Sequence, residues 1–281
     1  MSEEDEIKKF KETHPWPDED GIDSLYRFSR IGEDNIEFLR GLLVNRKLYH
    51  ALPNQFNDPF ECKPHFNWPS QPQNVQKIRK HLIKVARERG CSRKEAEGLI
   101  SKKFKKPGFI EEKIYGAIQR SLSEIRICCF TKQKENLLFW AHYADSHKGF
   151  CLEYDATLLP IKSAFKVTYN DEYPEVNYPW PQDARGLAPA LIKSEVWCYE
   201  EEYRILYVPE ANSKPEGDGQ SLLLPENAIK SIYFGENIDP KNKEKILELI
   251  NEGPFKPDVW QAQLSRSSFK LEFIRESSNT A

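Results

Sequence analysis

Apolar and polar positions along the chain change period several times, and each change predicts a different element. Residues 24–31 (SLYRFSRI) have the pattern of a strand, and residues 33–51 (EDNIEFLRGLLVNRKLYHA) that of a helix leading into a short extended segment. Further strands are predicted at 125–131, 149–154, 164–170, 201–208, 229–238, 259–265 and 269–274, and a helix at 239–253.

Between these strands lies a segment with helical spacing and many charged residues. Residues 75–90 (VQKIRKHLIKVARERG), 94–106 and 109–125 predict three helices, so we interpret the range from about 72 to 125 as a lateral helical insertion. Its charge run favours a solvated helix face, with a binding surface as the alternative.

The grouping of the strands predicts the fold class. Strands gathered in this way, with unevenly placed helices, indicate an α+β fold with a mixed, largely antiparallel sheet. We expect a charged N-terminal segment over residues 1–20, followed by a single α+β domain over 21–281 that contains the helical insertion.

One stretch, residues 136–155 (NLLFWAHYADSHKGFCLEYD), joins a predicted helix directly to a strand. Asn136 is a fair N-cap, and the spacing predicts a helix that places Trp140, Ala144 and His147 on one stripe. We expect Trp140 and Ala144 to pack in the core. The other face, with His142, Tyr143 and Asp145, is predicted to reach the rim of a cleft.

Composition and charge exclude some classes of partner. Forty-one basic against 44 acidic residues give a net charge of -3, so no general attraction to nucleic acid or to an anionic membrane is expected, and local basic patches remain an open alternative. No apolar run approaches about 20 residues, and the acidic start MSEEDEIKKFKE lacks a signal-peptide core, so we expect a cytoplasmic protein without membrane contact. The six cysteines form no CxxC pair and are predicted to be reduced.

Two short motifs carry candidate chemistry. In FNDPFE, Asn57, Asp58 and Glu61 could present an amide and two carboxylates from a turn that Phe56 and Phe60 anchor; an Asx-turn that only closes the loop is the alternative. The phosphate-binding motifs GxxxxGK[ST] and GxGxxG are absent, as are HExxH and GxSxG.

The second motif is WCYEEEYRILYV, residues 197–208. The period of a strand places Glu200, Glu202 and Arg204 on one face and Glu201 on the other, with Tyr203. A carboxylate fixed by an arginine could stabilise an oxocarbenium-like transition state. The alternative is a solvated acidic strand edge.

Taken in order and spacing, LYRF, FNDPFE, CCFT, WAHYADSHKGF and EEEYR resemble a bacterial family known as domain-of-unknown-function family 2971, over about residues 23–275. The resemblance implies a cytoplasmic bacterial protein, in some members encoded near mobile or phage-defence genes. It does not imply a reaction.

The layout is also similar to that of ADP-ribosyltransferases, which split NAD at its nicotinamide glycosidic bond. This similarity implies that Arg27, on the first strand, holds the dinucleotide and that Glu202 contacts the ribose, with Glu200 completing a Glu-x-Glu pattern. Thr131 stands only loosely for the central Ser/Thr element, and the usual Ser-Thr-Ser run is absent.

Three functions follow as hypotheses. The first is an NAD-using transferase or NAD glycohydrolase, plausible as a toxin or phage-defence effector, with a protein or nucleic-acid acceptor and no metal. It predicts that Arg27 and Glu202 converge across adjacent strands. Its catalytic candidates are Glu202, Glu200 and Arg27, and its cofactor-binding candidates are Arg27, Trp140, Tyr143, His142, Asn57 and Asp58.

The second hypothesis is a metal-dependent nuclease or hydrolase that uses Asp58, Glu61, His142 and Asp145. It requires these side chains to lie within about 5 Å of a common point. The third is a non-enzymatic protein-interaction module. Substrate, acceptor and oligomeric state do not follow from the sequence.

Overall fold

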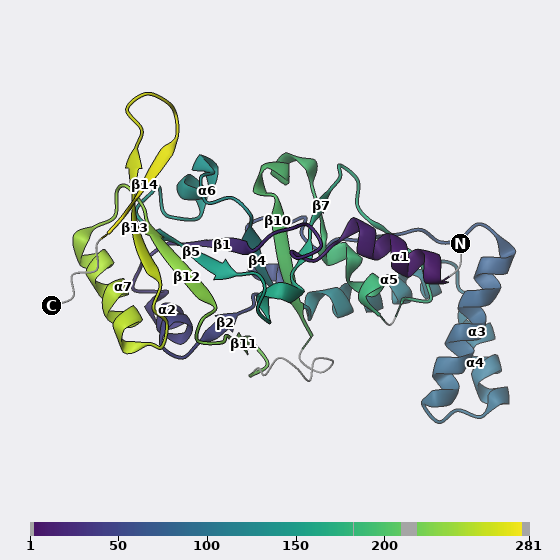
Figure 1. The fold of residues 1–281 in the computed structure, drawn as a ribbon. Coiled ribbons are helices and arrows are strands. Elements are labelled where there is room, and N and C mark those ends of the chain that lie inside the picture. Colours follow the sequence, from purple (N-terminus) through teal and green to yellow (C-terminus); the bar gives the residue numbers. More distant parts are fainter. Residues whose placement is uncertain (1–2, 182, 209–217, 277–281) are drawn as a thin grey trace.

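The computed structural model describes residues 3–181, 183–208 and 218–276 (Figure 1). Its main feature is an eight-stranded sheet in the order β14–β13–β12–β5–β1–β4–β10–β6. Within this sheet, only β12 and β13 pair in parallel, so the fold is α+β with a mixed, mostly antiparallel sheet, as the sequence predicts. In chain order, these strands are β1 (Ser24–Ser29), β4 (Arg126–Thr131), β5 (Phe150–Asp155), β6 (Phe165–Lys166), β10 (Glu202–Tyr207), β12 (Ile229–Phe234), β13 (Asp258–Leu264) and β14 (Leu271–Arg275).

Smaller elements pair beside the sheet. Short two-stranded ladders join β2 (Lys47–Tyr49) to β11 (Ser221–Leu223), β3 (His65–Phe66) to β8 (Glu175–Val176), and β7 (Thr168–Tyr169) to β9 (Ile192–Lys193). Four 3₁₀ turns connect the described elements: η1 (Pro53–Gln55), η2 (Ile161–Ser163), η3 (Ala184–Ala190) and η4 (Glu195–Glu200).

Alternation along the strands buries both faces of the sheet against different helices. On one face, Leu25 of β1 and Tyr154 of β5 pack in a core with α2 (Ile36–Leu43) and α7 (Pro240–Glu252). On the other face, Phe28 packs with Trp140 of α6 (Leu137–His142), which is completely buried. The described residues include no helix that is long and apolar enough to cross a membrane.

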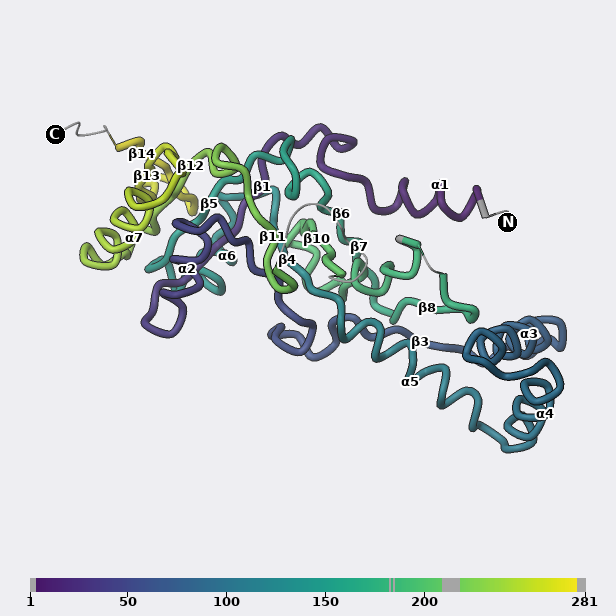
Figure 2. The backbone as a smooth tube through the Cα atoms, turned by 90° about the horizontal axis from the view of Figure 1, so that it is seen from below, coloured from purple at the N-terminus to yellow at the C-terminus, as the bar shows by residue number. Residues whose placement is uncertain are grey.

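The range in which the sequence predicts a helical insertion contains α3 (Pro72–Glu88), α4 (Arg93–Phe104) and α5 (Phe109–Ser123). Buried isoleucines and a leucine recur every four residues along α5, which attaches it to the body of the protein; they are Ile110, Ile114, Ile118 and Leu122. The pair α3–α4 extends away from the body, at the end opposite α7 (Figures 1 and 2). Helix α1 (Glu3–Thr13) lies on the same half of the molecule.

The sheet is weakly joined at its centre. Strands β1 and β5 pair over six residues, whereas β1 and β4 pair only through Tyr26 and Thr131. Further along β4, Ile127 instead bridges to Ala51, which follows β2. The two strands therefore separate after Tyr26, and the space between them is closed by other segments.

The helix predicted after Asn136 is shorter than its periodicity suggests. It ends at His142, and Asp145, Ser146 and His147 all have positive φ angles, so the prediction that His147 continues the helical stripe is wrong. The chain must turn here to enter β5, which pairs with β1 in the sheet. At Gly149 a Cβ would lie 2.1 Å from a backbone oxygen of β1, so only glycine fits.

Candidate functional site

A cavity of about 200 Å³ lies where β1 and β4 separate. Aromatic side chains from β1 and the α6 region line one side of it, and charged side chains from β10 and its neighbours line the other. The aromatic residues on the first side are Tyr26, Phe28, Phe139 and Tyr143. Arg27, Asn57, Glu200 and Glu202 also line it, so that with Tyr143 the structure brings together five of the eight candidate residues of the NAD hypothesis.

The charged side is a buried cluster of five ionisable groups, which we call the ionic cluster: Glu61, Lys193, Glu200, Glu202 and Arg204. Each side chain is at most 6% exposed. The alternative of a solvated acidic edge is therefore wrong, because β10 lies inside the sheet between β4 and β6.

The position of Glu200 also differs from the prediction. It ends the 3₁₀ turn η4 and does not lie on β10. Glu201 then adopts a left-handed conformation, with φ of 42°, and its side chain pairs with Lys132. The left-handed conformation of Glu201 makes a tight turn that brings Glu200 beside Glu202. The sequence pattern predicted instead that the two side chains share one face of a strand.

Arg204 organises the ionic cluster. Its guanidinium donates to both carboxylate oxygens of Glu61, at 2.9 and 2.8 Å, and to both oxygens of Glu202, at 2.8 and 3.0 Å. A fifth bond, of 2.8 Å, goes to the carbonyl oxygen of Ala190. All five donors of the guanidinium fork are thus used, which holds both carboxylates in fixed orientations.

Lys193 links the three acids. Its Nζ donates to Glu200 Oε2 at 2.5 Å and lies 3.3 and 3.4 Å from oxygens of Glu202 and Glu61. The second oxygen of Glu200 accepts a 2.6 Å hydrogen bond from the Tyr143 hydroxyl. Glu200 is therefore the acid at the border between the ionic cluster and the aromatic side of the cavity.

The two neighbouring carboxylates ionise differently. Burial alone would raise the pKa of Glu202, but the Arg204 guanidinium and the Lys193 ammonium outweigh it and lower the pKa to about 2. For Glu200, burial and the charge of Glu202 together raise the pKa above its usual range. Pairs of acids with separated pKa values are typical of sites in which one stays ionised while the other exchanges a proton.

Arg27 lies across the cavity and lacks an acidic partner. It is partly buried, and no carboxylate in the described part of the chain forms an ion pair with it. Its electrostatic neighbours are Cys128, Tyr154 and Cys129. Arg27 and Glu202 do not converge across adjacent strands as predicted, since β4 lies between β1 and β10.

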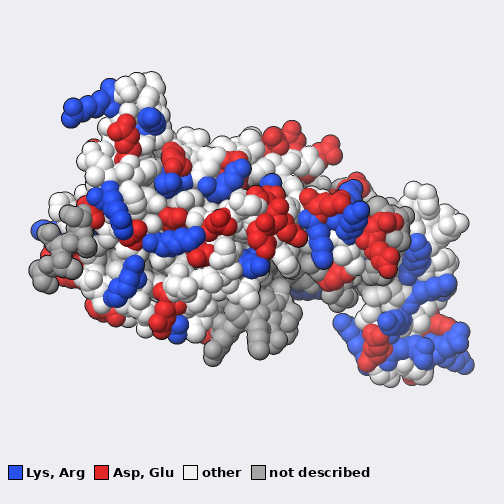
Figure 3. All heavy atoms as spheres, in the orientation of Figure 1, with Lys and Arg blue, Asp and Glu red and all other residues white. Residues whose placement is uncertain are grey.

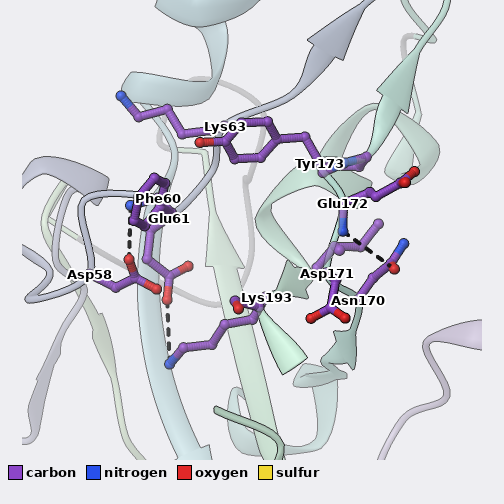
Figure 4. A pocket seen from close by; sticks show the side chains of 12 residues that line it. Asp58, Phe60, Glu61, Lys63, Asn170, Asp171, Glu172, Tyr173 and Lys193 are labelled. Carbon is purple, nitrogen blue, oxygen red and sulfur yellow. Dashed lines mark hydrogen bonds and ion pairs between the residues drawn. The ribbon is translucent and has the colours of Figure 1, made fainter. Parts of the chain in front are cut away.

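A second cavity, of about 360 Å³, lies behind the ionic cluster, and Figure 4 shows its side chains. Glu61 and Lys193 line both cavities and point toward one another. Asp58 lines only the second cavity, and its Oδ1 accepts a 2.9 Å bond from the backbone N–H of Phe60, which is the Asx-turn alternative. Phe60 is 62% exposed and does not anchor the turn as expected.

Two candidate residues of the helix that follows Asn136 lie elsewhere. Trp140 is completely buried, and its Nε1 donates to the carbonyl oxygen of Lys134, so it cannot line the cavity as predicted. His142 is exposed at the end of α6, outside the residues that line the cavity.

The predicted metal-ligand set does not assemble either. Asp145 is exposed at the turn after α6, like His142, whereas Asp58 and Glu61 are buried in the other loop. Among the described residues, no group of three or more His, Cys, Asp or Glu side chains is arranged to hold a metal ion.

One member of the site, Lys193, was missed from the sequence, because it follows a Pro-rich loop without a recognisable motif. Glu61 was predicted as a carboxylate of the FNDPFE turn and as a possible metal ligand, but its 143-residue separation from Arg204 gave no signal of their pairing. No family model, curated protein or solved structure matches the chain. The resemblance to family 2971 therefore stays a prediction.

Proposed function

We propose that the cavity between β1 and β4 binds the nicotinamide–ribose end of NAD and breaks its N-glycosidic bond, passing ADP-ribose to water or to an acceptor. The observation that carries this proposal is the pair Glu200 and Glu202, whose pKa values are displaced in opposite directions beside one cavity. Arg27, which has no carboxylate partner among the described residues, and an aromatic side supply the other two requirements of such a site.

The size of the cavity supports binding of only part of the dinucleotide. Cavities that enclose a whole drug-sized ligand measure about 300–1,000 Å³. At about 200 Å³, this one suits a ring and a sugar, with the remaining nucleotide outside its mouth. In this arrangement, Phe28, Phe139 and Tyr143 would stack against the nicotinamide ring. Arg27, which has no carboxylate partner in the described residues, would donate hydrogen bonds to a diphosphate oxygen.

The charges suit a dissociative reaction. When the C1′–N bond breaks, its electron pair stays with the pyridinium ring and neutralises it, so nicotinamide leaves without needing a proton. Positive charge develops on the ribose. With Glu200 ionised, the ionic cluster has three carboxylates and two cations, hence a net charge of -1, and would stabilise that cation through Glu202 and Glu200.

Glu200 would then act as the general base. The attacking water or acceptor loses a proton when its oxygen or nitrogen bonds to C1′, and the raised pKa of Glu200 makes it the better proton acceptor of the two acids. Glu202 has both oxygens engaged by Arg204 and keeps its negative charge.

The test is nicotinamide release from NAD by the purified full-length protein, measured by liquid chromatography. We expect Glu200→Gln to lower the rate by about 10²–10⁴-fold, as for loss of a general base. Glu195→Gln, at an exposed position in the same turn η4, is the matched control and should retain the wild-type rate. Neither binding nor cleavage of NAD by the wild-type protein, or a Glu200→Gln variant with full activity, would refute the proposal.

A further inference from the structure

The projecting pair α3–α4 is far more basic than the rest of the chain. We call residues 72–106 the basic arm. It contains twelve Lys and Arg residues and three Glu residues, a formal charge of +9, whereas the whole chain has a net charge of -3. The remaining residues therefore carry -12. Figure 3 shows Lys and Arg gathered on the end that Figure 1 labels α3 and α4.

Most of these cations have no acidic partner. Within the described residues, only Lys84 and Arg93 of the twelve form an ion pair, each with a glutamate four positions further along its own helix. Ten of the twelve are exposed: Lys77, Lys80, Lys84, Arg87, Arg89, Arg93, Lys94, Lys102, Lys105 and Lys106. Repulsion among these exposed cations disfavours the folded helical pair unless a bound polyanion neutralises their charge.

The cations on α3 follow one line. Lys77, Lys80, Lys84 and Arg87 are spaced by three, four and three residues, which places them on one face of the helix over about 15 Å. We call these four residues the α3 stripe. Such a row of fixed positive charges matches a polyanion with evenly repeated charges, because each cation can meet a separate phosphate.

The α3 stripe begins at a large groove. A cavity of about 770 Å³ lies between α1, the start of α3, residues 174–181 and residues 185–189, and Lys77 lines it. Half-buried Tyr178 and Trp180 also line it, beside Phe66. The groove is bordered by two carboxylates, but Glu6 pairs with Arg185 and Glu175 accepts a bond from Asn67.

We infer that the basic arm and the adjoining groove bind single-stranded nucleic acid, with phosphates along the α3 stripe and unstacked bases against the rings of the groove. Sites for single strands combine a positively charged track with aromatic platforms on which bases stack. The inference stands on charge and shape at this end of the molecule and does not depend on the chemistry of the cavity between β1 and β4.

A membrane fits the basic arm less well. Helices that lie on a bilayer insert large apolar side chains beside their lysines. On α3 and α4, Leu99 is the one such side chain among the exposed large apolar residues. Duplex nucleic acid also fits less well, because a base-paired strand could use the stripe but leave the ring-lined groove empty.

The experiment is fluorescence anisotropy of the full-length protein with a labelled 20-nucleotide oligothymidylate at several KCl concentrations. The test variant replaces all four residues of the α3 stripe with Gln. Its control replaces four exposed lysines elsewhere, Lys241, Lys245, Lys256 and Lys270, with Gln, and so loses the same net charge. Circular dichroism checks that both variants remain folded.

We expect the α3-stripe variant to bind at least tenfold more weakly and the control to bind like the wild type. The slope of log K against log salt should fall by about 3, at about 0.7 for each lost phosphate contact on a single strand. Tyr178→Leu, which keeps every charge, should weaken binding without changing this slope.

Four results would overturn the inference. The first is no binding of the oligonucleotide at 50 mM KCl. The second is equal weakening in the control, which would indicate attraction by overall charge alone. The third is tighter binding of a matched duplex, and the fourth is tighter binding of vesicles that contain phosphatidylserine.

Discussion

The ionic cluster predicts that two Glu→Gln substitutions at similarly buried positions have very different effects on stability. Glu61→Gln disrupts a two-point ion pair, because the fully buried Arg204 guanidinium donates a hydrogen bond to each carboxylate oxygen of Glu61. Gln has one acceptor oxygen, and its amide group would face a guanidinium donor. Breaking a buried pair in this way costs about 3–5 kcal/mol in the free energy of unfolding.

Glu200→Gln should cost about 1 kcal/mol or less. The Gln oxygen can still accept the bond from Tyr143, and Lys193 retains Glu202 and Glu61 at 3.3 and 3.4 Å. The ionised form of Glu200 is in any case disfavoured by burial and by the charge of Glu202, as its raised pKa indicates.

The sign of the pH dependence follows from the same shift. A carboxyl whose pKa is raised on folding favours the folded state at low pH, and this contribution is lost as pH rises through the raised value. Gln cannot lose a proton. The stability of Glu200→Gln relative to the wild type should therefore increase as pH rises.

The assay is urea unfolding at pH 7.5, followed by circular dichroism and by tryptophan fluorescence, with Glu195→Gln as control. Coincident transitions from the two probes would justify a two-state free energy. We expect Glu61→Gln to be less stable than Glu200→Gln by at least about 2 kcal/mol. Equal destabilisation would refute the assignment of Glu200 to the border of the ionic cluster.

Three further predictions concern other parts of the fold. Burial lowers the pKa of His50 from 6.5 to about 3, so the free energy of unfolding should fall as pH drops from 6.5 toward 3, by up to about 1.4 kcal/mol per pH unit. His50→Gln should flatten this slope in urea titrations, and an unchanged slope would contradict the burial of a neutral imidazole. Tyr143→Phe removes a hydrogen bond that lowers the pKa of Glu200, so the rising limb of the plot of kcat/KM against pH for NAD cleavage should move to higher pH. A rising limb that stays in place would argue against Glu200 as the general base. Gly149→Ala puts a Cβ 2.1 Å from a backbone oxygen of β1 and should lower the free energy of unfolding by about 3 kcal/mol or more, measured by thermal or urea unfolding. Gly41→Ala, whose Cβ would have no atom within 4 Å, should instead stabilise α2 by up to about 1 kcal/mol. Similar effects at both glycines would be inconsistent with the close approach of β1 and β5.

Much of the fold follows from local patterns. Alternating residues predicted the strands, and fourfold spacing of apolar residues predicted a helix where α5 lies. The helix after Asn136 was predicted too long, because the turn at Asp145 depends on the close approach of Gly149 to β1, and no local periodicity carries that information.

The site shows the same limit in a different form. Glu202 and Arg204 are two residues apart on one strand, so their shared face could be predicted. Glu61 and Lys193 reach them from distant loops, and the pairing of Arg204 with Glu61 is a property of the folded chain alone. Trp140 was predicted both to pack in the core and to bind the cofactor. Its complete burial confirms the first prediction and shows that the second is wrong, because its size and apolar surface favour the core.

Glu61 and Lys193 each face two compartments, one between β1 and β4 and one behind it. A charge that enters either compartment acts on the same two groups, and in surroundings of low polarity such a charge is felt over several ångströms. Ligands in the two cavities are consequently coupled through Glu61 and Lys193. An anion bound in one cavity weakens the binding of a second anion in the other, and by thermodynamic reciprocity the second weakens the binding of the first by the same factor.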